Sequence, residues 1–180
     1  MDDAKPDDLG HAQALAQGTH GDPFAFLGPH RQGSQLSVRA FVPGAVAVRA
    51  LDAQTQQPLA DLSAGHIGGI YTGHLPADAR YLLEIDWGGV LQMTEDPYSY
   101  GTLLGDLDLY LIGEGNHREL GRVLGAQVMR VGEVHGVRFA VWAPNARRVS
   151  VVGDFNAWDG RRHPMRNRGG VWEIFIPRLA

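Results

Sequence analysis

The sequence predicts an all-β protein, built from two tandem β-sandwiches that are joined by a short helical connector. Three observations support this fold class. Short runs with a two-residue period of apolar side chains are separated by Gly and Pro. One of these runs recurs 101 residues later in the chain, and a Leu-rich segment with helical character lies between the two copies.

Composition limits the classes of protein that fit. The chain has 180 residues with 24 Gly, 10 Pro, no Cys and a formal net charge of -4. This length allows one large domain or two small ones, but a complete (β/α)₈ barrel needs about 250 residues. A hydrophobic share of 44% with 20% charged residues is typical of folded globular chains.

Net charge and cysteine content limit the classes of binding partner and the cellular compartment that fit this sequence. The mild acidity and the scarcity of Lys argue against nucleic acid or a membrane as partner, and no apolar run approaches the roughly 20 residues of a membrane span. Without Cys there are no disulfides or thiolate metal sites, which fits a reducing compartment. We expect a cytoplasmic protein with no cofactor and no metal site.

The first domain follows a short N-terminal segment. Residues 1–18 are predicted to form a helix or a flexible tail, with Asp7 or Asp8 as the cap, a helix over 11–16 and Gly18 at its end. Residues 19–104 are predicted to form the first sandwich. Its strands are expected at 36–41, 46–51 and 69–75, followed by a hairpin whose arms, 81–87 and 90–93, flank Gly88-Gly89.

The repeat defines the second domain. Residues 105–124 are predicted to be the helical connector, and residues 125–180 the second sandwich. Residues 139–146 match 38–45, and 170–177 match 69–76, with one common offset. The first copy continues past Pro76 into the hairpin, whereas the sequence given ends soon after Pro177. We therefore expect two immunoglobulin-like sandwiches, the second incomplete at its C-terminus, at the front of a longer polypeptide.

Several motifs carry a family resemblance. Residues 139–146, the Gly153-x-Phe155-Asn156-x-Trp158 motif with its extension to Arg166, and residues 170–177 closely resemble the family 48 carbohydrate-binding module of bacterial glycogen (1,4-α-glucan) branching enzymes. Residues 22–30, 95–98 and 113–117 resemble the extra N-terminal domain of these enzymes. The core motif is shared with isoamylase-type debranching enzymes, but the extension 158–166 is more typical of branching enzymes.

The resemblance implies that glucan binding and catalysis lie in different parts of the full-length enzyme. In this family the full enzyme cuts an α-1,4-glucan chain and rejoins it through an α-1,6 bond, using two carboxylates of a downstream glycoside hydrolase family 13 barrel in a retaining double displacement. No position here matches those catalytic motifs, so we expect no catalytic residue and no activity from this chain alone. The implied partners are an α-glucan, either glycogen or a linear maltooligosaccharide, and the downstream barrel of the same polypeptide.

Four residues form the candidate glucan-binding site. Glucans are neutral and rich in hydroxyls, with apolar C–H faces, so a binding site needs an exposed aromatic ring and planar hydrogen-bonding groups. Trp158 fits the ring because it follows loop-forming Asn and Asp residues. Asn156, Asp159 and Arg161 could bond sugar hydroxyls. The alternative is that Trp158 packs against a neighbouring domain and that Asp159 and Arg161 form a structural ion pair.

The other tryptophans and a pair of nearby carboxylates are interpreted as structural residues. Trp142 and Trp172 are expected in the core or at a domain interface, and Trp87 in cross-strand packing. Glu84 and Asp86 are interpreted as a solvated strand face. Beside the leading hypothesis of a glucan-binding N-terminal part of a branching enzyme, two others remain: a free-standing glycan-targeting or regulatory module, and a purely structural supporting domain.

Overall fold

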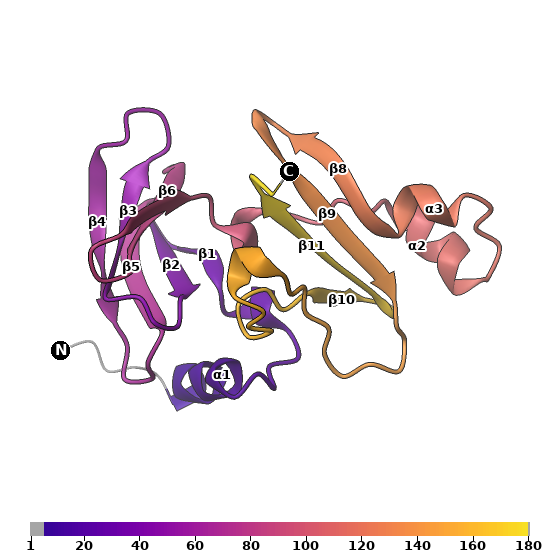
Figure 1. The fold of residues 1–180 in the computed structure, drawn as a ribbon, viewed down its shortest axis with the longest axis horizontal. Helices are drawn as coiled ribbons and strands as arrows, with labels where there is room; N and C mark the ends of the chain where they lie inside the picture. The colour runs from indigo at the N-terminus through magenta and orange to yellow at the C-terminus, as the bar shows by residue number, and fades with distance from the viewer. Residues whose placement is uncertain (1–5, 180) are drawn as a thin grey trace. The chain divides into compact units, whose positions relative to one another are not determined.

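The computed structural model describes the backbone of residues 6–179, which divide into two compact units (Figure 1). The first unit comprises residues 6–20 and Phe24–Ser99, and the second comprises Gly21–Pro23 and residues 100–179. The elements of the first part of the chain are α1 (Pro6–Ala16), η1 (Pro23–Ala25), β1 (Gly28–Gln32), β2 (Gln35–Phe41), β3 (Ala47–Asp52), β4 (Pro58–Ala64), β5 (Ile70–Pro76), β6 (Tyr81–Asp86), β7 (Leu91–Thr94) and η2 (Pro97–Ser99). Those of the second part are α2 (Asp106–Gly113), α3 (Leu120–Val123), β8 (Gly125–Val131), β9 (Val134–Trp142), η3 (Asp154–Asn156), β10 (Arg166–Arg168) and β11 (Val171–Pro177).

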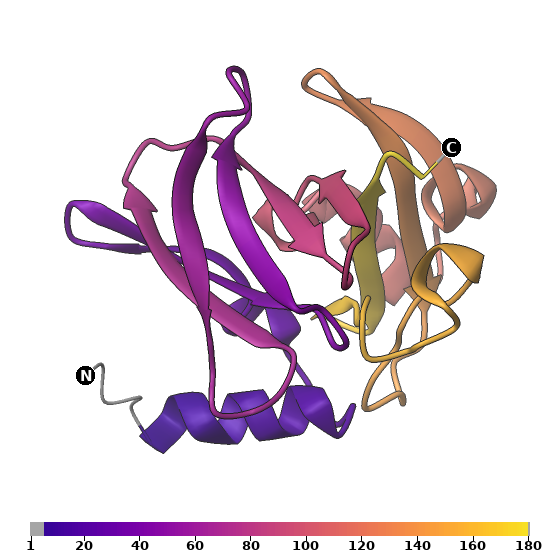
Figure 2. The same cartoon turned by 60° about the vertical axis from the view of Figure 1, so that its left-hand side comes forward.

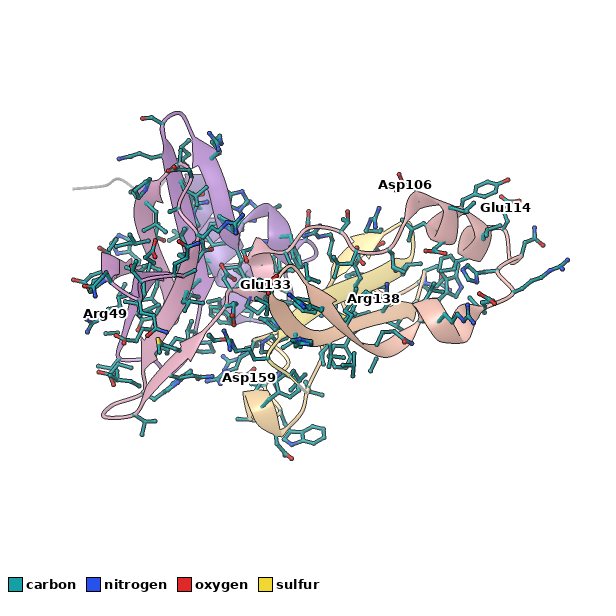
Figure 3. The ribbon with its side chains drawn as sticks, turned by 90° about the horizontal axis from the view of Figure 1, so that it is seen from above. Arg49, Asp106, Glu114, Glu133, Arg138 and Asp159 are labelled. Atoms are coloured by element: carbon teal, nitrogen blue, oxygen red, sulfur yellow. The ribbon has the colours of Figure 1, made fainter. Side chains whose placement is uncertain are left out.

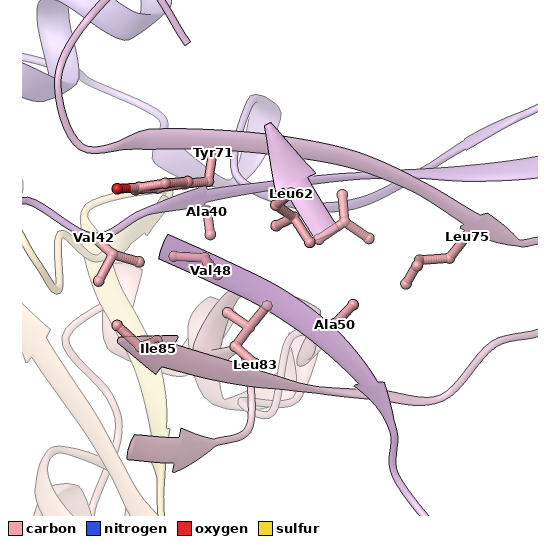
Figure 4. Packing of buried hydrophobic residues seen from close by; sticks show 10 residues of the cluster. Ala40, Val42, Val48, Ala50, Leu62, Tyr71, Leu75, Leu83 and Ile85 are labelled. Carbon is pink, nitrogen blue, oxygen red and sulfur yellow. The ribbon is translucent and has the colours of Figure 1, made fainter. Parts of the chain in front are cut away.

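The first unit is a β-sandwich whose strands run in the order β1-β2-β5-β4-β3-β6-β7. Strand β4 pairs with β3 through residues 58–62 and with β5 through Ser63 and Ala64, so it passes from one half of the sandwich to the other. The core lies between the two halves (Figure 4), and its buried side chains are Val38, Ala40, Val42, Val48, Ala50, Leu62, Tyr71, Leu75, Leu83 and Ile85. Each buried Val, Leu or Ile contributes about 1.5–3 kcal/mol, which makes this cluster the main source of the unit's stability.

The predicted hairpin is present at 81–94. Trp87 and Val90 close the turn with a backbone hydrogen bond of 2.9 Å, and Gly88 and Gly89 have φ of +85° and +111°. The Asp86 carboxylate accepts the N–H groups of both glycines at 2.8 and 3.0 Å, and these bonds lower its pKa. Left-handed backbone at two consecutive positions is the reason why this turn requires glycine.

Helix α1 differs from the prediction at its start and agrees at its end. It begins at Pro6, so Asp7 and Asp8 lie inside the first turn and the prediction that one of them caps the helix is wrong. Proline supplies the preset φ that favours the first helical turn. Gly18 ends the helix with φ +68°, as its N–H bonds to Leu15 and that of Thr19 to Ala14.

The second unit contains a four-stranded sheet in the order β10-β11-β9-β8, and the helical segment belongs to this unit. Residues Leu104 and Ile112 pack against Ala140 and Val171 of the sheet. The Glu173 carboxylate accepts the Leu104 N–H at 3.1 Å, and Arg168 donates to the Leu104 carbonyl at 2.6 Å. These bonds hold the segment before α2 against β10 and β11.

The repeat predicted from sequence is present as a repeated strand pair. In the first unit Phe41 of β2 faces Ile70 of β5, and 101 residues later Trp142 of β9 faces Val171 of β11. The same offset applies along both strand pairs. Residues 148–153, the counterparts of β3, form only an isolated bridge between Ser150 and Pro164 in the described part of the chain. In the described residues the second unit therefore has one four-stranded sheet where the first has two halves.

Candidate functional site

The candidate residues lie on one loop of the second unit, residues 153–163, which we call the Trp158 loop. Its first turn is η3, and the turn ends in two consecutive left-handed residues, Ala157 with φ +54° and Trp158 with φ +57°. The Trp158 N–H bonds to the Gly153 carbonyl at 3.0 Å and the Ala157 N–H to Asp154 at 3.2 Å, the hydrogen-bond pattern of a Schellman motif. Non-glycine residues rarely adopt this backbone, so the loop stores strain that its other bonds must offset.

Trp158 presents its indole ring to solvent. The residue is 66% exposed, although its ring N–H donates to Asp154 Oδ1 at 2.8 Å. That bond fixes the ring by its polar edge and leaves apolar surface in contact with water. Figure 3 shows the loop, marked by Asp159, projecting from the ribbon. Within the described part of the chain the ring is therefore not packed in a core, and the alternative that it packs against a neighbouring domain stays open.

Asn156 lies inside the loop. It is 1% exposed, its Oδ1 accepts the Gly153 N–H at 3.0 Å, and its Nδ2 donates to the Val151 carbonyl at 2.9 Å. The same NH₂ group lies 2.9 Å from His163 Nδ1, which must therefore act as the acceptor. The polar atoms of Asn156 are thus already hydrogen-bonded within the loop. The structure therefore gives Asn156 a role in positioning the loop, in place of the predicted bond to a sugar hydroxyl.

His163 supports this arrangement in its neutral form. Burial, followed by the charge of Arg162, lowers the pKa of His163 to about 4. Near neutral pH the ring is therefore uncharged, with a lone pair on Nδ1 for Asn156 and the proton on Nε2. The ring also lies 5.4 Å from that of Phe155, centroid to centroid. Sequence reasoning missed His163 and Asp154, and the available signal was their position within the same short motif as Trp158.

Asp159 and Arg161 form an ion pair beside the indole. Arg161 Nη2 lies 2.7 Å from Asp159 Oδ2, and Arg161 Nε lies 2.9 Å from Oδ1. The bonds to Arg161 lower the pKa of Asp159 to about 2, so the carboxylate is ionised at physiological pH. The pair is planar and charged at the surface, and such groups can bond hydroxyls at their solvent side while remaining paired.

The stems of the loop are held by main-chain contacts. The Val151 N–H bonds to the His163 carbonyl at 3.1 Å, and the Met165 N–H to Val149 at 2.8 Å. Arg148 donates to the Gly160 carbonyl, which anchors the far side of the loop. Trp158 is therefore carried by a structured loop, which lowers the entropy lost when a ligand binds.

The remaining tryptophans have different environments. Trp172 is 2% exposed and donates to the Ala143 carbonyl at 3.0 Å, in agreement with its predicted burial. Trp87 donates to Gln92 of β7 at 2.9 Å, a cross-strand contact as expected. Trp142 ends β9 and is 40% exposed, with its ring close to Gly170, so it is not a core residue, and its predicted place at a domain interface stays a prediction.

Glu84 and Asp86, interpreted from the sequence as a solvated strand face, take part in structural contacts. Glu84 lies 2.9 Å from Arg49 on the neighbouring strand, and Asp86 binds the turn described above. Within residues 8–179 no group of three metal-ligating side chains lies close enough to hold an ion. Among the described helices, none is long and apolar enough to cross a membrane. The Trp158 loop combines an exposed aromatic ring with planar polar groups.

Comparison with known proteins agrees with this geometry. Residues 123–180 match the model of carbohydrate-binding module 48 (isoamylase N-terminal domain), and residues 8–98 match that of the alpha-1,4-glucan branching enzyme GlgB N-terminal domain. The chain is similar to 1,4-alpha-glucan branching enzyme GlgB of Pseudomonas fluorescens, with 60% identity over 92% of this chain, and to GlgB 2 of Rhizobium johnstonii, with 57% identity over 93%.

The matched region is a minor part of those relatives. The chain spans 23% of the length of both proteins, and also 23% of a 58% identical GlgB from Cupriavidus pinatubonensis. The model for the N-terminal domain covers more than half of this chain. On this evidence, the chain belongs to the family of alpha-1,4-glucan branching enzyme GlgB N-terminal domains.

Proposed function

We propose that this chain is the glucan-binding N-terminal part of a cytoplasmic glycogen branching enzyme. In this proposal the full-length protein transfers a cleaved α-1,4-glucan segment to a 6-hydroxyl, and the catalytic barrel lies further along the same polypeptide. The observation that carries the proposal is the exposed indole of Trp158 on a loop fixed by its own internal hydrogen bonds. The family match over residues 123–180 supports the same ligand class.

The binding mode follows from the chemistry of the loop. The apolar C–H face of a glucose unit stacks on the open surface of Trp158, and the neighbouring ring hydroxyls reach Asp159 and Arg161. Stacking on an aromatic ring contributes roughly 1–3 kcal/mol when a nucleic-acid base is the partner, and we take this range as the scale for a sugar. A glucan has no net charge, so binding is expected to depend little on salt.

Affinity electrophoresis in gels containing glycogen tests the proposal. Wild-type protein should be retarded, and Trp158→Ala should lose about tenfold or more in affinity because the stacking surface is gone. Tyr110→Ala is the matched control, since Tyr110 is an exposed aromatic residue of α2 outside the loop and its removal should leave retardation unchanged. Equal mobility of the wild-type chain with and without glycogen would contradict the proposal and favour a structural supporting domain.

A further inference from the structure

A groove of about 640 Å³ lies in the first unit between α1 and the strands β2, β4 and β5. This volume falls within the range of about 300–1,000 Å³ that is typical of small-molecule sites. Residues Asp8, Leu9 and Ala12 of α1 form one wall. In Figure 2, α1 is the indigo helix that lies across the lower end of these strands. None of its lining residues belongs to the Trp158 loop.

The floor of the groove is the outer face of three paired strands. Arg39 of β2 faces Thr72 of β5, which in turn faces Ser63 of β4. On the same face of the sheet, two residues before Arg39 on β2, Ser37 faces His74. All five side chains line the groove, so hydroxyl, guanidinium and imidazole groups lie in two rows across the sheet. Their neighbours on the same strands, among them Val38 and Leu75, point into the sandwich core instead.

The charges in the groove nearly cancel. Arg39 lies 3.3 Å from Asp8 of α1 and stacks over the ring of Phe26, with its guanidinium carbon 4.8 Å from the ring centroid. Asp61 is the other acidic residue in the lining, beside His66 and His74. An anionic ligand such as a phosphate would need an excess of positive charge, which this lining lacks. A neutral ligand with many hydroxyls fits a mixed set of donors and acceptors on small side chains.

We propose that this groove is a second glucan-contact site, which holds a short stretch of α-glucan on the first unit. The inference rests on the proposed function for the class of ligand, but on different residues. Thr72, Ser63 and His74 bond the sugar hydroxyls, and the Arg39–Asp8 pair keeps α1 in place as the opposite wall. Leu9 and the half-buried Ile67, which also line the groove, offer apolar surface to the C–H faces.

Amide NMR shifts of the ¹⁵N-labelled chain during a maltoheptaose titration test both sites separately. The amides of Ser63, Thr72 and His74 report on the groove, and those of Ala157 and Trp158 report on the loop. In the wild-type chain both sets should move. In Trp158→Ala the loop set should stop responding while the groove set still moves with an unchanged midpoint.

Filling the groove provides the complementary variant. Ser63 is exposed, so Ser63→Trp places a large ring over the floor without disturbing the core, and the groove affinity for maltoheptaose should fall about tenfold or more. Ser34→Trp makes the same exchange at an exposed turn outside the groove and should leave both sets unchanged. A groove response that survives Ser63→Trp undiminished would overturn the placement of this site.

The outcomes separate this inference from the proposed function. Groove amides that stay still while the loop amides saturate would overturn the second site and leave the role of Trp158 intact. Groove amides that move while the loop amides stay still would support the groove and contradict the role of Trp158. A groove response to sodium phosphate in place of maltoheptaose would show an anion site and overturn the inference.

Discussion

At the scale of single residues, Asn156 determines how Trp158 is presented. Sequence alone placed both residues in one motif and suggested that both touch sugar, because residue type indicates what a side chain can bond but not where it points. In the structure Asn156 is buried and bonds Gly153, Val151 and His163, while Trp158 points outward. The direction depends on the left-handed turn at 157–158, which no local propensity of Ala or Trp predicts.

Removing the Asn156 amide should therefore impair binding without touching the ligand. Asn156→Ala leaves the Gly153 N–H and the Val151 carbonyl without their partner, and an unsatisfied buried group costs about 1–3 kcal/mol. We expect a lower midpoint of thermal unfolding together with reduced retardation by glycogen. Asn145→Ala, at an exposed turn, serves as the control. Wild-type retardation by the Asn156 variant would show that the turn holds its shape unaided.

The neutral state of His163 predicts a dependence of stability on pH. The pKa of this group is about 4 in the folded protein and 6.5 in the unfolded chain, so between these values the unfolded state binds more protons. The free energy of unfolding should therefore rise with pH from about 4 to 6.5, by up to about 3 kcal/mol at 1.4 kcal/mol per pH unit. Below pH 4 both states are protonated and no further loss is expected.

Urea unfolding at several pH values measures this contribution as a difference between variants. Asp96, whose pKa burial raises to about 6, contributes with the opposite sign, since its share is lost as the pH rises toward 6. Only the comparison with His163→Gln isolates the histidine, and His135→Gln, at an exposed position, is the control. Identical pH slopes for wild type and His163→Gln would contradict the predicted role.

At the scale of elements, the strand pairs β2–β5 and β9–β11 share one register and one close packing contact. A Cβ added at Gly69 would lie 2.9 Å from Pro43 Cα, and one added at Gly170 would lie 3.1 Å from Pro144 Cα. In both units the backbone of a glycine thus packs against a proline. This proline follows β2 in the first unit and β9 in the second. The sequence predicted this repeat because the same Gly and Pro recur at one offset.

Other strands gave no such signal. The sequence reasoning missed β1 and β4, whose burial is partial and whose apolar residues do not alternate regularly. Strand β4 begins with a proline and buries only Leu62 fully. Pairing with neighbours that are distant in the sequence, rather than an amphipathic pattern, stabilises such strands, and a single sequence does not reveal those partners.

Two consecutive glycines at the β10–β11 turn allow the contribution of this packing contact to stability to be measured. Gly169 and Gly170 both have positive φ, at +63° and +94°, but only the Cβ at Gly170 would meet other atoms. We expect Gly170→Ala to destabilise the chain more than Gly169→Ala, by at least about 1 kcal/mol, because overpacking adds to the backbone strain. Chemical denaturation gives both values, and equal losses would show that the contact relaxes freely.

At the scale of the whole molecule, the described chain contains a sandwich, a helical segment and a second sheet that carries the candidate site. Two family models cover the sandwich and the second sheet in the same order along the chain, and the helical segment lies between them. The order was predictable from the sequence, since the motifs of each part are continuous in the chain. The groove of the first unit was not, because its floor combines residues of three strands whose pairing the sequence does not show.

At this scale we predict that residues 1–180 alone have no branching activity. Glu84 and Asp86 are two carboxylates close together on one strand, but Glu84 pairs with Arg49 and Asp86 holds a turn, so their contacts are structural. Incubation of residues 1–180 with amylose should leave the iodine colour unchanged over the time in which a full-length GlgB removes it. Reproducible loss of colour from the purified chain would contradict the proposed non-catalytic role.

The solvent exposure of Trp158 also makes it an optical reporter. Of the four tryptophans, Trp172 is enclosed, whereas the Trp158 ring faces water on a fixed turn. The difference in fluorescence emission between wild type and Trp158→Phe therefore isolates one red-shifted emitter. Occupancy of the loop by a sugar can be followed through this signal in unlabelled protein, without attaching a dye.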